Sequence, residues 1–165
     1  MDAAFKQWLD SVCWWIDATP FSQAIQDASW ITPAAQTVHI LAIAALMASM
    51  LMINLRLTGL LGCDQPLAQV SARFSPAIWW ALPVLLVSGA ILVTGEPARV
   101  LKSNLFQIKM LLLISAILVT MLSTEPLKED PTYWDDRTGI GLLVALLSVS
   151  LWVGIIFAGR WIAYF

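Results

Sequence analysis

Four long apolar stretches dominate this sequence and restrict the chain to a membrane fold. They lie at about residues 33–57, 76–94, 105–123 and 139–158. Each approaches the roughly 20 residues that an α-helix needs to cross about 30 Å of hydrocarbon. Because backbone polar groups must be paired in lipid, each stretch is expected to be a helix. Their short connections predict an all-α, up-down-up-down four-helix bundle, a single membrane domain over residues 1–165.

The charge content of the chain supports a membrane fold. Only 12% of the residues are charged and 59% are hydrophobic, whereas a soluble domain has about 25% charged residues. The nine Trp also fit, because Trp favours the membrane–water interface. The net charge of −2 without a basic cluster argues against a nucleic-acid partner. The lipid bilayer is therefore the expected environment.

The first 30 residues predict helices that lie on the membrane rather than cross it. Apolar side chains recur there at helical spacing: Phe5, Trp8, Leu9, Val12, Trp15 and Ile16. Asp10 and Asp17 fall on other faces of this helix, which makes it an amphipathic, interfacial one. Thr19 and Pro20 suit the N-cap and first position of a second short helix. The acids and lack of a continuous apolar core do not match a secretory signal.

The first apolar stretch carries small residues at a spacing that favours contact between helices. Ala44 and Ala48 form one small-xxx-small pair, and Ala45 and Ser49 form another. Such pairs let helix backbones approach closely in lipid. Four short spans bury little surface among themselves, so these faces are free for a neighbour. We expect a homo-oligomer, with a dimer favoured.

The second stretch predicts an interfacial start and a bend. Trp79 and Trp80 come near its predicted beginning, where aromatic rings meet the headgroups. Pro83 lies inside the stretch. A proline within a helix removes a backbone hydrogen bond, so Pro83 predicts a kink.

Basic residues do not fix the orientation of the bundle. Two groups of four fall on opposite sides of the membrane: Lys6, Arg99, Lys102 and Arg160, and Arg56, Arg73, Lys128 and Arg137. This balance gives no positive-inside signal. The N-terminal helix has a single Lys, so it gains little from the anionic cytoplasmic leaflet. We therefore expect both termini on the periplasmic side.

His39, the one histidine of the chain, is the first candidate site residue. It lies nearly two turns inside the first stretch, and an ionisable residue within a span is by default a functional candidate. The alternative is a neutral His that hydrogen-bonds a neighbouring helix. Gln36, three residues earlier, is placed to orient the ring, as partners of ligand histidines do. Ala35 and Ala42 either leave room for a flat macrocycle, which Ile43 limits on one side, or serve plain helix packing.

Lys109 is the second candidate, near the start of the third stretch. There a Lys either snorkels to the interface or faces inward to pair with an anion such as a haem propionate or a substrate carboxylate. Arg56 closes the first stretch, about 25 Å from His39 at helical rise. Arg56 is therefore expected to anchor that end of the helix rather than share a site.

The methionines of the first stretch raise copper binding as an alternative. Met50 lies eleven residues after His39, or about 16 Å along the helix, so one ion cannot bind both. The Met cluster is therefore expected to fill the core, unless other helices supply ligands. Cys13 and Cys63 have no zinc or c-type haem spacing and are expected on opposite sides of the membrane. No hydrolase motif is present, so catalytic residues stay unassigned.

Several segments together resemble a bacterial four-span membrane family of unknown function. Residues 29–60 carry its W-x-x-P, H and LRLTG pattern, and residues 88–97, 104–113 and 151–165 resemble its TG turn, its F-x-x-K entry and its terminal GRW. The resemblance implies a multi-pass protein of the bacterial inner membrane. Asn54 stands where the family pattern has Asp, so a role for that carboxylate does not carry over.

More distantly, the layout is similar to the copper-resistance D (CopD) family and the HemJ-type protoporphyrinogen oxidases. Those proteins are small helical membrane proteins with a His early in a first span and a Lys early in a later one. HemJ-like proteins are associated with b-type haem. The resemblance therefore implies His39 as axial metal ligand and Lys109 as a site residue.

Three functions stay open from the sequence. The first is a membrane haem protein for electron transfer or a redox-coupled reaction, working with a redox partner protein. One His per chain gives a five-coordinate iron or a bis-His iron shared by two subunits. The second is a copper-handling or copper-transport protein. The third is a non-enzymatic scaffold or partner subunit, in which His39 is a packing residue.

Overall fold

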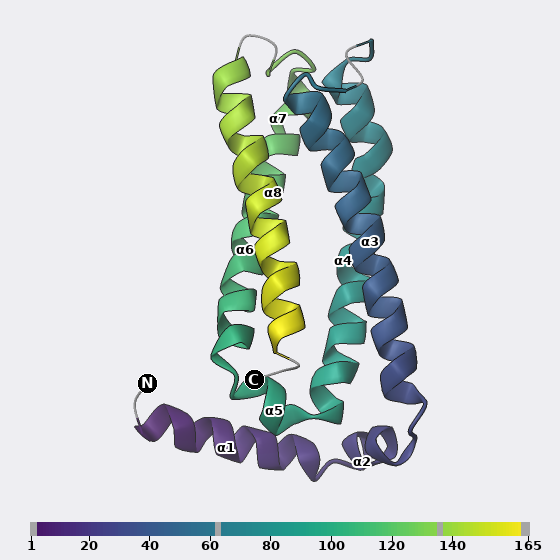
Figure 1. Cartoon of the computed structure of the whole chain (residues 1–165), viewed down its shortest axis with the longest axis vertical. Coiled ribbons are helices and arrows are strands. Elements are labelled where there is room, and N and C mark those ends of the chain that lie inside the picture. The colour runs from purple at the N-terminus through teal and green to yellow at the C-terminus, as the bar shows by residue number, and fades with distance from the viewer. Residues whose placement is uncertain (1–2, 62–63, 135–136, 163–165) are drawn as a thin grey trace.

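The computed structural model describes residues 3–61, 64–134 and 137–162. Within these ranges the chain is helical and contains no strand (Figure 1). The helices are α1 (Ala3–Asp17), α2 (Pro20–Asp27), α3 (Ile31–Leu57), α4 (Leu67–Gly95), α5 (Pro97–Leu101), α6 (Asn104–Thr124), α7 (Pro126–Glu129) and α8 (Thr138–Trp161).

Four of these helices form the membrane bundle. α3, α4, α6 and α8 stand side by side with alternating direction (Figure 1), and each is long and apolar enough to span a bilayer. α3 packs along α4, α6 packs along α8, and contacts between α3 and α8 join the two pairs. The predicted all-α four-helix bundle is confirmed.

The helix that contains the second predicted span is longer than that span. α4 begins at Leu67, nine residues before residue 76, with Pro66 as its N-cap and both Pro76 and Pro83 inside it. Val70 and Ser71, in the first turns of this helix, are buried. Packing against the bundle therefore extends this helix beyond its apolar core. The kink at Pro83 stays a prediction.

The pairing of α3 with α4 sets the depth of their side chains. His39 lies against Ser88, and a Cβ at Gly95 would lie 3.6 Å from Thr32 Oγ1. The same antiparallel register brings Trp80 level with Met47, close to the middle of α3. The expectation that Trp79 and Trp80 lie at a membrane interface stays a prediction.

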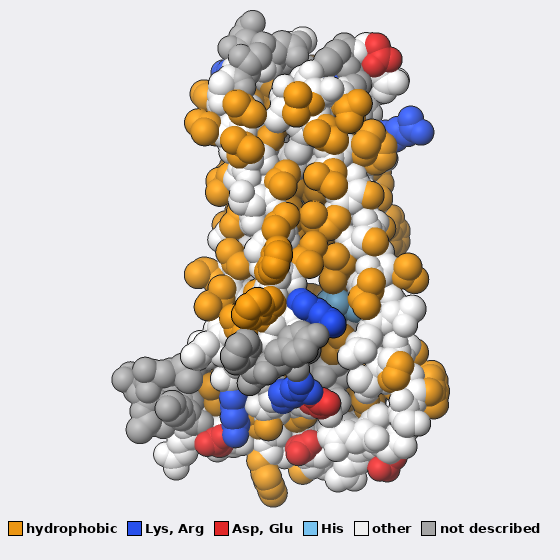
Figure 2. All heavy atoms as spheres, in the orientation of Figure 1, with side chains coloured by type: hydrophobic (Ala, Val, Ile, Leu, Met, Phe, Trp, Pro, Cys, Tyr) orange, Lys and Arg blue, Asp and Glu red, His pale blue; other side chains and the backbone are white. Residues whose placement is uncertain are grey.

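All four long helices contribute to one buried core, which fills the middle of the bundle. Its buried members are Leu46, Met50, Ile53, Ile78, Ala81, Ala116, Trp152 and Ile155. The predicted packing role of the Met cluster is confirmed for Met50, which is 3% exposed, but not for Met52, which is 41% exposed. Large apolar side chains also cover the outside of the bundle (Figure 2), as expected of a surface that faces lipid rather than water.

α1 and α2 lie across one end of the bundle (Figure 1). The predicted cap between them is confirmed, because the Thr19 side chain accepts a hydrogen bond from the Ser22 N–H and Pro20 opens α2. α1 buries Cys13 against α5, with Cys13 Sγ 3.7 Å from the Pro97 carbonyl. Its Trp8, Trp14 and Trp15 are exposed, as expected of an amphipathic interfacial helix. Cys63 lies outside the described residues.

Candidate functional site

His39 and Lys109 face the same part of the bundle interior. Thr120 Oγ1 of α6 lies 3.9 Å from Met50 Sδ of α3, so these residues face each other in the core. His39 and Lys109 each lie eleven residues before one of them, and eleven residues make about three helical turns. The two residues therefore point inward at similar depth, and Lys109 is within electrostatic range of His39.

A hydrogen-bond chain between α3 and α4 fixes the histidine ring. His39 Nδ1 lies 2.8 Å from Ser88 Oγ, and Ser88 Oγ donates to the Val84 carbonyl at 2.6 Å. A serine hydroxyl has one hydrogen to donate. Because Ser88 donates it to the Val84 carbonyl, the Ser88 oxygen accepts a hydrogen bond from His39. The arrangement selects the neutral tautomer with the proton on Nδ1, which leaves a lone pair on Nε2.

The free ring nitrogen is the chemically usable part of His39. Among the described residues, no side chain donates a hydrogen bond to Nε2. The ring packs over Gly89 of α4, where a Cβ would lie 3.6 Å from His39 Cε1. His39 thus presents a fixed, half-buried nitrogen lone pair that can bind a metal or accept a proton.

Lys109 brings a cation to the same layer. Its side chain lies against Gly159 of α8, where a Cβ would lie 3.2 Å from Nζ. Within the described ranges no acid pairs with Lys109, and the ion pairs lie outside this layer: Glu96–Arg99, Asp10–Lys102 and Glu125–Lys128. Figure 2 shows the histidine beside a basic side chain in the lower half of the bundle. An unpaired ammonium inside a bundle is costly, so a ligand anion would stabilise it.

The orienting residue of His39 differs from the one that the sequence suggested. Gln36 is exposed, and it is Ser88 that contacts Nδ1. Ala35 and Ala42 are buried in helix packing. Ser88 was missed because it lies 49 residues from His39. The only sequence signal was its small Ser88–Gly89 pair within a span of bulky residues.

The donor set is unfavourable for a bare metal ion. The described part of the chain holds no group of three or more His, Cys, Asp or Glu side chains that could bind one. Met50 contacts Thr120 in the core, eleven residues from His39. A haem iron needs only an axial ligand from the protein, because the macrocycle supplies its other donors. The single nitrogen of His39 thus supplies fewer donors than a bare copper ion needs.

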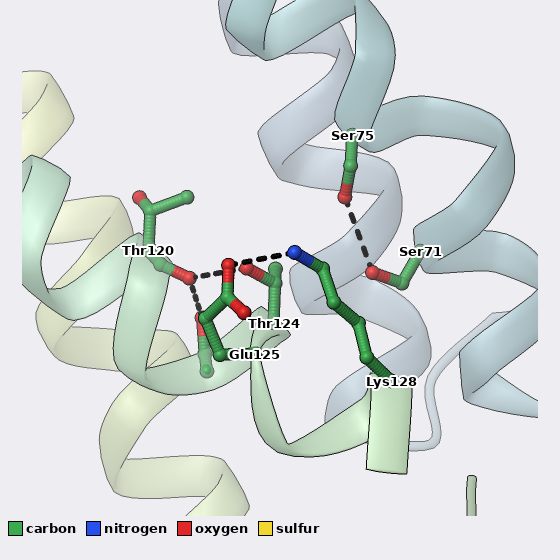
Figure 3. Close-up of polar contacts among 7 residues, drawn as sticks. Ser71, Ser75, Thr120, Thr124, Glu125 and Lys128 are labelled. Carbon is green, nitrogen blue, oxygen red and sulfur yellow. Dashed lines mark hydrogen bonds and ion pairs between the residues drawn. The ribbon is translucent and has the colours of Figure 1, made fainter.

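A second polar cluster lies toward the other end of the bundle, and its hydrogen bonds are satisfied internally. Asn54 Nδ2 donates to the Met50 carbonyl at 2.9 Å and to Ser148 Oγ at 3.3 Å. Figure 3 shows Thr120 and Thr124 with the Glu125–Lys128 pair, and Ser71 and Ser75 opposite. The two threonines donate to backbone carbonyls of α6. The layer of His39 and Lys109, with unused polar groups, is the stronger candidate site.

The chain belongs to a family of unknown function, DUF6644, which matches residues 26–165. The match covers all four long helices and confirms the predicted membership of a membrane family of unknown function. No curated protein and no solved structure matches the chain. The comparisons show no similarity to the CopD or HemJ-type proteins.

Proposed function

We propose that this chain is a haem-binding protein of the bacterial inner membrane, which acts in electron transfer or a redox-coupled reaction. His39 is the proposed axial ligand, through Nε2. The observation that carries the proposal is the hydrogen-bond chain from His39 to Ser88 and Val84. It keeps the proton on Nδ1 and leaves Nε2 as a lone pair inside the bundle, the state that a metal ligand requires.

Other residues of the layer suit a b-type haem. Lys109 provides a cation for a propionate, and Gly89 and Gly159 add no side chain around His39 and Lys109. When bound, the iron would supply one-electron transfer. Ser88 would hold the ring in place and raise its basicity, as hydrogen-bond partners of metal-binding histidines do. The apolar core on one side of the layer limits access of water, which influences the potential of the iron.

An absorption spectrum of the detergent-purified protein tests the proposal. We expect a Soret band that is lost in His39→Ala and retained in Gln36→Ala, a matched change at an exposed position of the same helix. Added hemin should restore the band to wild-type protein that was purified without haem. A folded wild-type preparation that is colourless and does not take up hemin would contradict haem binding.

A partner-subunit or scaffold function is the second candidate, because the His39–Ser88 hydrogen bond is also one that a packing histidine makes. A glutamine at position 39 can donate to Ser88 in the same way. If His39 only packs, His39→Gln should leave the stability of the protein and of its complexes unchanged. If His39 binds haem, the same variant should lose the Soret band. Copper handling, the third alternative, predicts copper in the purified protein and altered growth under copper stress.

We also propose a homodimer with both termini on the periplasmic side. Ala44, Ala45 and Ala48 are exposed along one side of α3, where small residues allow a neighbouring helix to approach. Crosslinking in membranes should give a dimer, and Ala48→Trp should reduce the amount of dimer.

The proposed orientation has a separate test. Reporter fusions at either terminus should be active in the periplasm, and activity in the cytoplasm would contradict the proposed orientation.

A further inference from the structure

An apolar groove of about 520 Å³ runs between α3 and α4 on the outside of the bundle. Trp30 and Ala34 line it from α3, and Trp80, Val87 and Ser88 line it from α4. Its accessible surface is almost wholly apolar, so the indole N–H groups and the Ser88 hydroxyl do not open into it. The groove therefore suits a hydrocarbon and offers nothing to a polar headgroup.

The depth of the groove matches one leaflet of a bilayer. Trp30 is the N-cap of α3, at the end of the bundle where α1 and α2 lie. On α4 the lining runs from Trp80 to Ile91, eleven residues or about 16 Å at helical rise. Half of the hydrocarbon core measures about 15 Å, and the headgroup region adds several more. The groove therefore runs from the headgroups of this leaflet to about the bilayer centre.

The walls of the groove favour a flexible chain over a helix. Trp30 is 71% exposed and Trp80 is 75% exposed, so a bulky ring projects near each end. Helices that pack in lipid prefer small residues at their contact, and an α-helix with its side chains is about 10–12 Å wide. We propose that this groove binds one acyl chain of a phospholipid from the leaflet that contains α1 and α2.

The bound chain would form the outer wall of the His39 layer. Ser88 lines the groove, and its hydroxyl is bonded to His39 and to the Val84 carbonyl. A seated acyl chain covers Ser88 from the lipid side and keeps competing polar groups away from these hydrogen bonds. This inference does not depend on haem, because it rests on the groove and on the depth of its walls.

Native mass spectrometry of protein released from phosphatidylethanolamine–phosphatidylglycerol nanodiscs tests the proposal. We expect one retained phospholipid per wild-type chain and loss of that lipid in Ala34→Trp, whose side chain fills the groove. Leu86→Trp is the matched control, because Leu86 is an exposed residue of α4 that does not line the groove. Val87→Trp gives a second groove variant if Ala34→Trp does not fold.

Three results would overturn the proposal. The first is wild-type protein that retains no lipid, and the second is groove variants that retain as much phospholipid as the control. The third is a wild-type dimer, free of lipid, that the groove variants convert to monomer, because it would assign the groove to a second copy of the chain. Each result leaves the Soret test of His39 unaffected, so the two proposals can fail separately.

Discussion

His39 Nδ1 and Ser88 Oγ lie 2.8 Å apart, and this bond between two helices determines which nitrogen of the ring remains free. The Ser88 hydroxyl uses its single hydrogen in a bond to the Val84 carbonyl. His39 must therefore donate a hydrogen bond to Ser88 from Nδ1. The backbone of α4 thus sets the protonation of a side chain on α3. A hydroxyl without this backbone acceptor would allow either tautomer.

Removing the Ser88 hydroxyl should weaken ligand binding at His39 without removing the ligand atom. Ser88→Ala frees the ring to rotate and to change tautomer, and loss of such a partner typically lowers metal affinity about 10–100-fold. Hemin titration followed at the Soret band measures the effect. Ser88→Thr keeps a hydroxyl and should bind nearly as the wild type does. Equal affinity in Ser88→Ala would show that the bond does not orient a ligand.

Lys109→Met should make the protein more stable and a poorer haem binder. The substitution removes a cation with no acid partner in the described part of the bundle, and a Lys at the centre of a membrane helix costs about 2.5–3.5 kcal/mol. Because Lys109 lies nearer the helix end and is half-buried, we expect a smaller gain. Thermal unfolding in detergent and hemin titration give the two readouts.

The control for Lys109→Met is Lys128→Met, in an exposed ion pair with Glu125. Exposed pairs contribute little, so this variant should change neither stability nor binding. A Lys109→Met protein that is less stable than the wild type would indicate that the ammonium has a structural partner.

The spans and the N-terminal cap could be predicted because their signals are local. Four apolar windows give four helices, and Thr19–Pro20 predicts a helix start from two adjacent residues. Such signals depend only on bilayer thickness and backbone hydrogen bonding. The start of α4 escaped prediction, since its polar first turns are held by contacts with distant segments. A hydropathy window does not detect such contacts.

The candidate site could be predicted only in part, because some of it depends on contacts between helices. His39 and Lys109 stood out because ionisable residues are rare inside spans. Their common layer depends on how α3 and α6 are aligned, which the Met50–Thr120 contact reveals. Gln36 was chosen from spacing within one helix, whereas the actual partner, Ser88, comes from the next helix. Periodicity identifies the face of a helix, but not the residues that face it.

Asn54→Asp should destabilise the bundle. The Asn54 amide donates to the Met50 carbonyl and to Ser148, and a carboxylate has no proton to donate. The change places an acceptor against a carbonyl in a buried position, so we expect a loss of about 1–3 kcal/mol. Ser148→Ala removes only one interhelical bond and should cost less, about 0.6 kcal/mol. Thermal unfolding of both variants shows which one loses more stability. An Asn54→Asp protein as stable as the wild type would contradict the prediction.

An exposed ion pair between α1 and the C-cap of α5, Asp10–Lys102, should be lost at high pH. Lys102 donates to Asp10, and this hydrogen bond raises the pKa of Lys102 above its ordinary value of 10.5. A raised folded-state pKa means that the stabilisation is present below the unfolded-state pKa and is lost as the pH rises through the folded-state one. Because exposed pairs contribute little, the contact of α1 should open only slightly more often above pH 10.5 than at neutral pH.

Cys13, buried where α1 meets α5, reports this opening in a Cys63→Ser background. A rise in its labelling rate at high pH that depends on Asp10 measures opening of the contact. We expect that rise in the parent protein as the pH increases beyond 10.5. Asp10→Asn should label faster at lower pH and lose the rise, because Lys102 then has no carboxylate partner. Labelling that stays flat with pH in the parent would mean that packing of Leu9 and Cys13 alone holds α1 in place.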